Sequence, residues 1–216
     1  MDPAAVASAK AEHAAAGLDV GDLDPDPIRM VQGWWDEVQR LDLPEPAAVV
    51  LITASPDANP LGRHVLLRAL DERGFTWFTN RASRKGRQLA ANPQACLVFP
   101  WYPVGRQVIV RGPAADIDDA ESDAYWATRP PGSRIAAAIS EQSAPIADRR
   151  WIEARFAELE ARYPDGDVPR PAHWGGQRLS PTEIELWQGR PNRMHDRFLY
   201  ERDVPEATWR ISRLAP

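Results

Sequence analysis

The chain has 216 residues and a formal net charge of −5, a length that suits one domain with an appendage. Its acidity excludes the basic footprint of non-specific nucleic-acid binding, and no apolar run reaches the roughly 18 to 20 residues of a membrane span. The N-terminus lacks the features of a signal peptide, so we expect a cytoplasmic protein with neither nucleic-acid nor membrane partners. The single cysteine, Cys96, excludes an internal disulfide.

The N-terminal part predicts two helices of different strength. Residues 1–25 are expected to be weakly structured, with one helix from Ala4 to Ala16. Asp26 and Pro27 are typical of an N-cap and a first helical residue. Apolar residues then recur at helical spacing and predict an amphipathic helix over 27–41.

The centre of the chain changes to short β-prone runs joined by turns. Strands are predicted over 47–53, 63–70, 75–79, 95–101 and 107–117, with a helix over 83–91. Strands joined by turns this short pair antiparallel. Five of them with few intervening helices indicate a small closed or nearly closed barrel.

Helices return in the next segment and strands end the chain. The helices are expected over 118–128, 132–140 and 147–163, followed by a polar linker over 165–171. A strand over 177–187 and a hairpin of 198–200 with 209–211 follow. The fold class is therefore α+β, an antiparallel barrel with peripheral helices.

The sequence contains no common catalytic signature, and its four histidines lack metal-ligand spacing, so we expect no metal site. What remains is a set of donor-rich segments. On the predicted strand 63–70, Arg63 and Leu67 share one face and His64 and Arg68 the other. Arg63 and Arg68 lie at the two ends of an apolar run, which is unusual for a strand in a barrel wall and indicates a binding role. The alternative is an ordinary strand whose two arginine side chains extend into solvent.

A second segment, residues 79–87, follows a strand and opens a helix. Helix N-termini attract anions, so Arg84 and Lys85 in the first turn are unfavourable unless an anion lies there. This conflict predicts a phosphate site, with a solvated basic turn as the alternative.

A third segment offers donors for a second phosphate. Tyr125 and Arg129 share a helix face, and Ser133 opens the next predicted helix. Ordinary helix capping by Ser133 is the alternative. Gln142-Ser143 and Trp174-Gly175-Gly176 are weaker signals.

The fourth segment is the basic cluster over 187–197. If this segment is extended, Arg193, His195 and Arg197 project to one side and suit an anionic, planar ligand. A charged loop in solvent has the same composition.

In order and spacing, these segments closely resemble the pyridoxine/pyridoxamine 5'-phosphate oxidase family, from about Asp26 to Pro216. The matching pieces are Arg-x-Val-Leu-Leu (63–67), Thr-Asn-x-x-Ser-Arg-Lys (79–85), Phe-Pro-Trp (99–101), Arg-Gln-Val (106–108), Gln142-Ser143, Trp-Gly-Gly (174–176), Arg-x-His-Asp-Arg (193–197) and the final Arg-Leu-Ala-Pro.

The resemblance implies a split β-barrel homodimer with FMN in the cleft between subunits, formed by a single domain over 26–216 whose dimerisation region spans about 174–216. The implied FMN contacts are Arg63, His64, Val65, Leu66, Leu67, Arg68, Phe78, Thr79, Arg84, Lys85, Gln107, Gln142, Ser143, Trp187 and Arg197, with Arg84 and Lys85 on the phosphate. The implied substrate contacts are Arg68, Tyr125, Arg129 and Ser133 at the phosphate, Lys10 in the N-terminal segment, and the catalytic pair Arg193 and His195 over the pyridine ring.

The implied activity is oxidation of pyridoxamine or pyridoxine 5'-phosphate to pyridoxal 5'-phosphate, with O2 reduced to H2O2. Two departures touch the substrate. Arg68 stands where the family usually has Lys, and Lys10 and His13 stand where its N-terminal Arg-x-x-Tyr covers the substrate. Residues 1–25 would then form a flexible segment able to act as a substrate lid.

Two alternatives remain open. A family relative could oxidise another substrate, such as a phenazine-type precursor, although Tyr125, Arg129 and Ser133 favour a phosphorylated one. A non-catalytic flavin- or pyridoxal-phosphate-binding protein is the other alternative, against which Arg193 and His195 argue.

Overall fold

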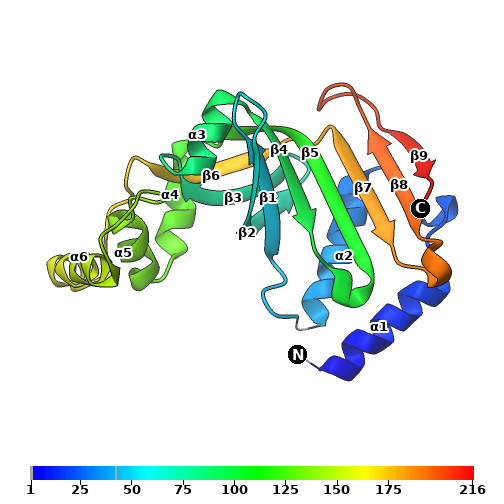
Figure 1. The fold of residues 1–216 in the computed structure, drawn as a ribbon, viewed down its shortest axis with the longest axis horizontal. Helices are drawn as coiled ribbons and strands as arrows, with labels where there is room; N and C mark the ends of the chain where they lie inside the picture. Colours follow the sequence, from blue (N-terminus) through cyan, green and yellow to red (C-terminus); the bar gives the residue numbers. More distant parts are fainter. Residues whose placement is uncertain (1, 42) are drawn as a thin grey trace.

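The computed structural model describes residues 2–41 and 43–216, and is built on one antiparallel sheet flanked by helices (Figure 1). Its strands are β1 (Ala48–Ala54), β2 (Pro60–Asp71), β3 (Gly74–Asn80), β4 (Gln94–Phe99), β5 (Arg106–Asp116), β6 (Trp174–Leu179), β7 (Glu183–Gln188), β8 (Asp196–Glu201) and β9 (Arg210–Leu214). Its α-helices are α1 (Pro3–Ala16), α2 (Pro27–Arg40), α3 (Arg84–Ala91), α4 (Asp119–Thr128), α5 (Pro131–Ile139) and α6 (Arg149–Arg162).

The strand order explains how the sheet closes. The order is β4-β1-β2-β3-β6-β5-β7-β8-β9, and a further pairing of β4 with β5 closes the first six strands into a barrel. β5 makes this possible because it is long enough to pair with β4, β6 and β7. The predicted α+β antiparallel barrel with peripheral helices is confirmed.

Two apolar clusters hold the parts together. The barrel interior contains fully buried side chains such as Leu51, Phe75, Trp77 and Phe99. A second cluster, which includes Trp126, Ile135 and Trp174, joins α4 and α5 to β6. In Figure 1, α5 and α6 lie at the opposite end of the molecule from β8 and β9. No helix among the described residues is long and apolar enough to span a membrane.

The predicted strand over 177–187 is two strands. β6 ends at Leu179 and β7 begins at Glu183. Between them, the N–H groups of Ser180 and Thr182 donate to the carbonyls of Pro113 and Arg111, while Pro181 has no N–H to donate. The chain therefore leaves β3 as a partner and continues along β5.

The helix predicted over Ala4–Ala16 is present as α1, but it is docked on the barrel, whereas the sequence predicted a weakly structured segment. His13 is buried: its Nδ1 lies 2.7 Å from the Val104 carbonyl and its Nε2 lies 2.5 Å from Glu37 Oε1. The Gln188 side chain donates to the His13 carbonyl. Since these partners come from α2, β7 and the turn before β5, spacing along α1 alone did not reveal them.

Glu37 connects α1 to the barrel, because its other oxygen accepts from Arg106 Nη1 at 2.5 Å. Although burial raises the pKa of Glu37, hydrogen bonds and charge from Arg106 and His13 lower it below its ordinary value of 4.5. A lowered pKa in the folded state stabilises the fold above that ordinary value, and this contribution is lost as pH falls through the folded-state pKa.

We predict that Glu37→Gln lowers the free energy of unfolding by about 2 kcal/mol near pH 7, because the buried Arg106 loses its charged partner and the bond to His13 changes its acceptor. The variant should also lose less stability than the wild type on acidification below about pH 4.5. Urea titrations at both pH values measure this. Asp203→Asn, which breaks the exposed pair with Arg210, is the matched control and should change the free energy of unfolding far less, because solvent screens this pair. Equal losses in the two variants would contradict the role given to Glu37.

Candidate functional site

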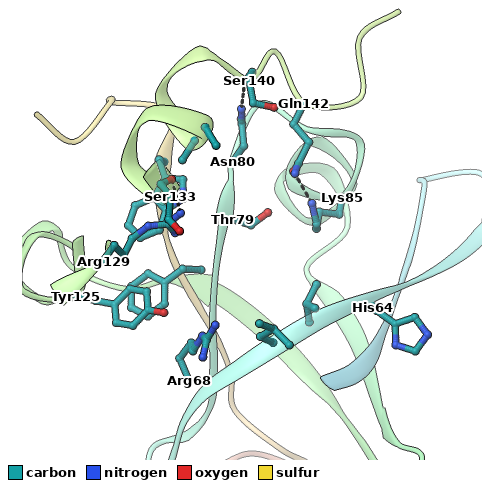
Figure 2. A pocket seen from close by; sticks show the side chains of 16 residues that line it. His64, Arg68, Thr79, Asn80, Lys85, Tyr125, Arg129, Ser133, Ser140 and Gln142 are labelled. Carbon is teal, nitrogen blue, oxygen red and sulfur yellow. Dashed lines mark hydrogen bonds between the residues drawn. The ribbon is translucent and has the colours of Figure 1, made fainter. Parts of the chain in front are cut away.

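An open pocket of about 460 Å³ lies between β2, β3 and helices α3, α4 and α5 (Figure 2). Its lining unites most of the residues predicted as cofactor or substrate contacts. These are His64, Val65, Leu66, Arg68, Phe78, Thr79, Lys85, Tyr125, Arg129, Ser133 and Gln142. Asn80, Ala136, Ala137, Ser140 and Trp174 complete the lining. In Figure 2, Lys85 and Gln142 lie on one side, and Arg68, Tyr125, Arg129 and Ser133 on the other.

The Lys85 side is built on the start of α3, as the sequence predicted. Ser83 is the N-cap, and its hydroxyl accepts from the Gly86 N–H. Arg84 N donates to Ser143 Oγ at 3.1 Å, and Lys85 Nζ donates to Gln142 Oε1 at 2.6 Å. Arg63, Arg84, Lys85 and Ser143 also line an adjoining open pocket.

These cations lie close together without acidic partners. Within residues 2–41 and 43–216, no carboxylate forms an ion pair with Arg63, Arg84 or Lys85. Burial, and then the charge of Arg63, lowers the pKa of Lys85 to about 8. Burial, and then the charge of Arg84, lowers the pKa of Arg63. A phosphate here would meet two guanidiniums, an ammonium and a helix N-terminus, which is the donor set that phosphate requires.

Arg68, Tyr125, Arg129 and Ser133 gather as a second donor cluster across the pocket. Arg129 Nη2 donates to the Ser133 carbonyl at 2.8 Å, while its buried Nε has no partner among the described residues. Burial lowers the pKa of Arg129, Tyr125 opposes this, and the charges of Arg68 and Arg134 add to it. Because an unpartnered buried donor is unfavourable, an anion bound here would stabilise the cluster.

Two details of this cluster differ from the sequence interpretation or refine it. Helix α5 begins at Pro131 with Pro130 as N-cap, so Ser133 lies inside the first turn and is not the cap. Arg68 lies at a β-bulge, where the pairing of β2 with β3 shifts between Leu67 and Ala69. Leu67, with 2% exposure, packs in the barrel core, so its side chain faces away from the pocket.

Three aromatic rings pack in a nearly parallel stack beside the second donor cluster. Phe78 stacks on Tyr125 with a centroid distance of 3.9 Å and on Trp174 at 5.3 Å. The Arg129 guanidinium lies 4.7 Å from the Trp174 ring centroid. Sequence reasoning gave Trp174 little weight and missed Asn80 and Ser140, whose partners are distant in the chain.

The remaining predicted site residues lie outside this pocket. Gln107 and Trp187 face each other across the β5–β7 pair, and the His195 ring lies 4.7 Å from Trp187. Arg197 pairs with Glu185 through Nε at 2.8 Å. Lys10, on α1, lies over the Tyr102 ring at 4.8 Å. In Figure 1, β7 and β8 lie at the right, apart from α3 and α4.

The predicted extended run through Arg193, His195 and Arg197 is wrong. Pro191–Arg193 form a 3-10 turn, in which Asn192 and Arg193 have φ values of 57° and 61°, and β8 begins only at Asp196. The turn brings His195 back toward Arg190, whose N–H donates to His195 Nδ1 at 3.0 Å. Strict alternation along 193–197 therefore does not hold.

Comparison with known proteins agrees with this geometry. Residues 35–163 match the family model described as pyridoxamine 5'-phosphate oxidase, and residues 174–216 match the pyridoxine 5'-phosphate oxidase C-terminal dimerisation region. The pyridoxine/pyridoxamine 5'-phosphate oxidase 1 of Ralstonia nicotianae is 50% identical over 98% of this chain and 99% of its own length. The pyridoxine/pyridoxamine 5'-phosphate oxidase of Rubrobacter xylanophilus is 49% identical over 98% of this chain and 96% of its own length.

A solved structure extends the likeness to three dimensions. PhzG from Burkholderia lata, in complex with tetrahydrophenazine-1-carboxylic acid, superposes with a TM-score of 0.85 and 32% identity over 91% of this chain and 95% of that one. The matched family models cover the barrel, the helices around the pocket and the C-terminal strands. The chain belongs to the pyridoxamine 5'-phosphate oxidase family of oxidoreductases.

Proposed function

We propose that this protein is an FMN-dependent oxidase that converts pyridoxamine or pyridoxine 5'-phosphate to pyridoxal 5'-phosphate, with O2 reduced to H2O2. The observation that carries the proposal is a pair of cationic donor clusters on opposite sides of one pocket lined by aromatic rings, the first cluster extending from Lys85 to Arg63 and Arg84 in the adjoining pocket. Such a pocket suits two phosphorylated, planar molecules. The family relatives named for this activity support the same assignment.

FMN fits the residues around Lys85. Its phosphate would lie among Arg63, Arg84 and Lys85, which have no carboxylate partners among the described residues, with Ser143 and Gln142 beside them. His64, Val65, Leu66, Phe78 and Thr79 line the adjoining wall, where the flavin ring would follow. When bound, FMN supplies the hydride acceptor and passes the electrons on to O2.

The substrate phosphate would lie in the second cluster, where the Arg129 Nε has no hydrogen-bond partner within residues 2–41 and 43–216. Arg68, Tyr125 and Ser133 contribute the other donors. Here Arg68 offers a planar, forked guanidinium for bidentate contact with the phosphate, which a lysine would not.

We further propose that the active site is completed in a homodimer. Gln107, Trp187 and Arg197 are register neighbours on one face of β5, β7 and β8, and Arg193 and His195 lie in the segment just before β8. All five are outside the pocket of their own chain. That face includes the segment matching the dimerisation region. A partner subunit would bring Arg193 and His195 over the substrate ring, where Arg193 positions the ring and His195 hydrogen-bonds its polar groups.

The lowered pKa of Lys85 makes FMN affinity pH-dependent. Lysine must be protonated to attract phosphate, and an ester phosphate is already a dianion above about pH 7. We therefore predict that affinity is full below the Lys85 pKa of about 8 and declines above it, by about fivefold between pH 8 and pH 9. Fluorescence titration of FMN measures this. In Lys85→Arg the decline should disappear, and persistence of the decline would assign it to another group.

One observation supports a second candidate function, oxidation of a phenazine-type precursor. The superposed PhzG was solved with tetrahydrophenazine-1-carboxylic acid. That ligand has a carboxylate and no phosphate, whereas Arg68, Tyr125, Arg129 and Ser133 form a cluster suited to phosphate. Turnover of unphosphorylated substrates over phosphorylated ones would favour the second function.

The test is direct. The purified protein is titrated with FMN, and pyridoxamine 5'-phosphate is then added in air while aldehyde and peroxide are followed. We expect a yellow protein that forms both products in equal amounts. Failure to bind FMN would contradict the whole proposal. Flavin binding without turnover would contradict only the assignment of the substrate.

A further inference from the structure

A short segment crosses from α5 to the phosphate-binding end of α3. We call residues 140–143 the strap. Ser140 is the residue at the C-terminal end of α5, and residues 141–143 are exposed. Ser143 has a φ of 77°, a region that residues other than glycine rarely adopt. The strap therefore needs contacts with the rest of the chain to hold the backbone conformation in which Gln142 and Ser143 lie beside α3.

Three side-chain hydrogen bonds join the strap to the rest of the described chain. Two of them use groups that a bound phosphate would also engage: Lys85 Nζ donates to Gln142 Oε1, and Arg84 N donates to Ser143 Oγ. The third is independent of the anion: Asn80 Nδ2 donates to the Ser140 carbonyl at 2.9 Å. Figure 2 shows this bond next to the bond between Lys85 and Gln142.

Asn80 also forms hydrogen bonds with the turn that leads into α3, across from the strap. The residue is buried, with 6% exposure, and its Oδ1 accepts from the Ala82 N–H at 2.8 Å. Its carbonyl accepts from the N–H of Ser83, the N-cap of α3. One buried amide therefore links the turn that begins α3 to the strap that faces it, so it sets the separation between Lys85 and Gln142.

We propose that Asn80 is a positioning residue for the cofactor phosphate, acting through the strap without contacting the phosphate itself. The proposal rests on the proposed binding of FMN phosphate by Arg84 and Lys85. Removing Asn80 leaves every phosphate donor in the chain but frees the strap. The lost preorganisation should therefore weaken the binding of a flavin that carries a phosphate and leave the binding of a flavin without one unchanged.

The test compares FMN with riboflavin, which has the same ring and no phosphate. For Asn80→Ala we expect FMN to bind about 3- to 10-fold more weakly, with riboflavin affinity changed less than about twofold. Asn80→Asp retains the acceptor for Ala82 but loses the donor to Ser140 and adds a negative charge, so its FMN loss should be larger. The matched control is Gln32→Ala on α2. It removes a hydrogen bond from the Gln32 side-chain amide to the Leu70 carbonyl and should change neither affinity.

A double-mutant cycle separates positioning from general destabilisation. If Asn80 acts through the strap, Asn80→Ala should cost little more FMN affinity once Gln142→Ala has removed the strap contact to Lys85. Equal loss of FMN and riboflavin affinity, or full additivity with Gln142→Ala, would overturn the proposal. If Asn80→Ala does not fold, Asn80→Ser, which removes the donor to Ser140 without adding a charge, gives the same comparison. A wild-type protein that binds no FMN would instead contradict the proposed function.

Discussion

Replacing Lys85 with alanine should weaken FMN binding about 100-fold while changing riboflavin affinity little. Lys85 lies in a cluster with Arg63 and Arg84 that has no carboxylate partner among the described residues, and burial lowers its pKa to about 8. A charge-assisted bond to phosphate in such a half-buried site contributes more than a neutral one. Fluorescence titration with the two flavins measures the difference.

Arg87 provides the control for the loss of a positive charge. It lies on the same helix and lines the same adjoining pocket, but it is exposed and its guanidinium already donates to the Ala82 carbonyl. Arg87→Ala should therefore lower FMN affinity only modestly. If Lys85→Ala weakened FMN and riboflavin equally, Lys85 would be supporting the pocket as a whole and not binding the phosphate.

Replacing Arg193 with alanine should lower turnover about 100-fold or more while FMN stays bound. Arg193 is exposed in the 3-10 turn before β8, outside the pocket that holds the proposed FMN donors. Its proposed task is to orient the substrate ring across the subunit interface. Misplacement of a reacting group by about 1 Å already costs about this much in rate. Steady-state oxidation of pyridoxamine 5'-phosphate, with the flavin spectrum as a check of cofactor content, tests the prediction.

Arg210→Ala is the matched control in the same C-terminal region. Arg210 lies on the exposed strand β9 and forms an ion pair with Asp203. Its replacement should leave turnover unchanged. Loss of the flavin in Arg193→Ala would mean that this residue belongs to the cofactor site and would contradict the role proposed for it.

Local signals predicted the parts of the fold and site that depend on neighbours in the chain. The helix over 27–41 followed from apolar spacing, and α2 indeed spans Pro27–Arg40 with Asp26 as N-cap. The short turns required antiparallel pairing, which the barrel confirms. The charges of Arg84 and Lys85 conflict with a bare helix N-terminus, and both residues lie beside Arg63 with no ion pair to a carboxylate in the part of the chain that the structure describes.

Features that depend on distant partners could not be predicted in this way. His13 is ordered by Glu37 and Val104, and Asn80 by Ser140, and none of these pairs leaves a periodic trace in the sequence. Asn192 and Arg193 have positive φ in a 3-10 turn, which rules out the extended conformation that the alternation of Arg193, His195 and Arg197 required. The separation of Arg193 from the pocket is visible only once the barrel closes.

The central claim is that each active site takes the Lys85 cluster from one subunit and Arg193 from its partner. Subunit complementation tests it most directly, by mixing and refolding Lys85→Ala with Arg193→Ala at an FMN concentration that saturates only the intact site. Random pairing gives heterodimers with one intact site, so we predict recovery of about a quarter of wild-type activity from two nearly inactive parents. Heterodimers that form, as shown with a tag on one subunit, yet remain inactive would contradict the claim.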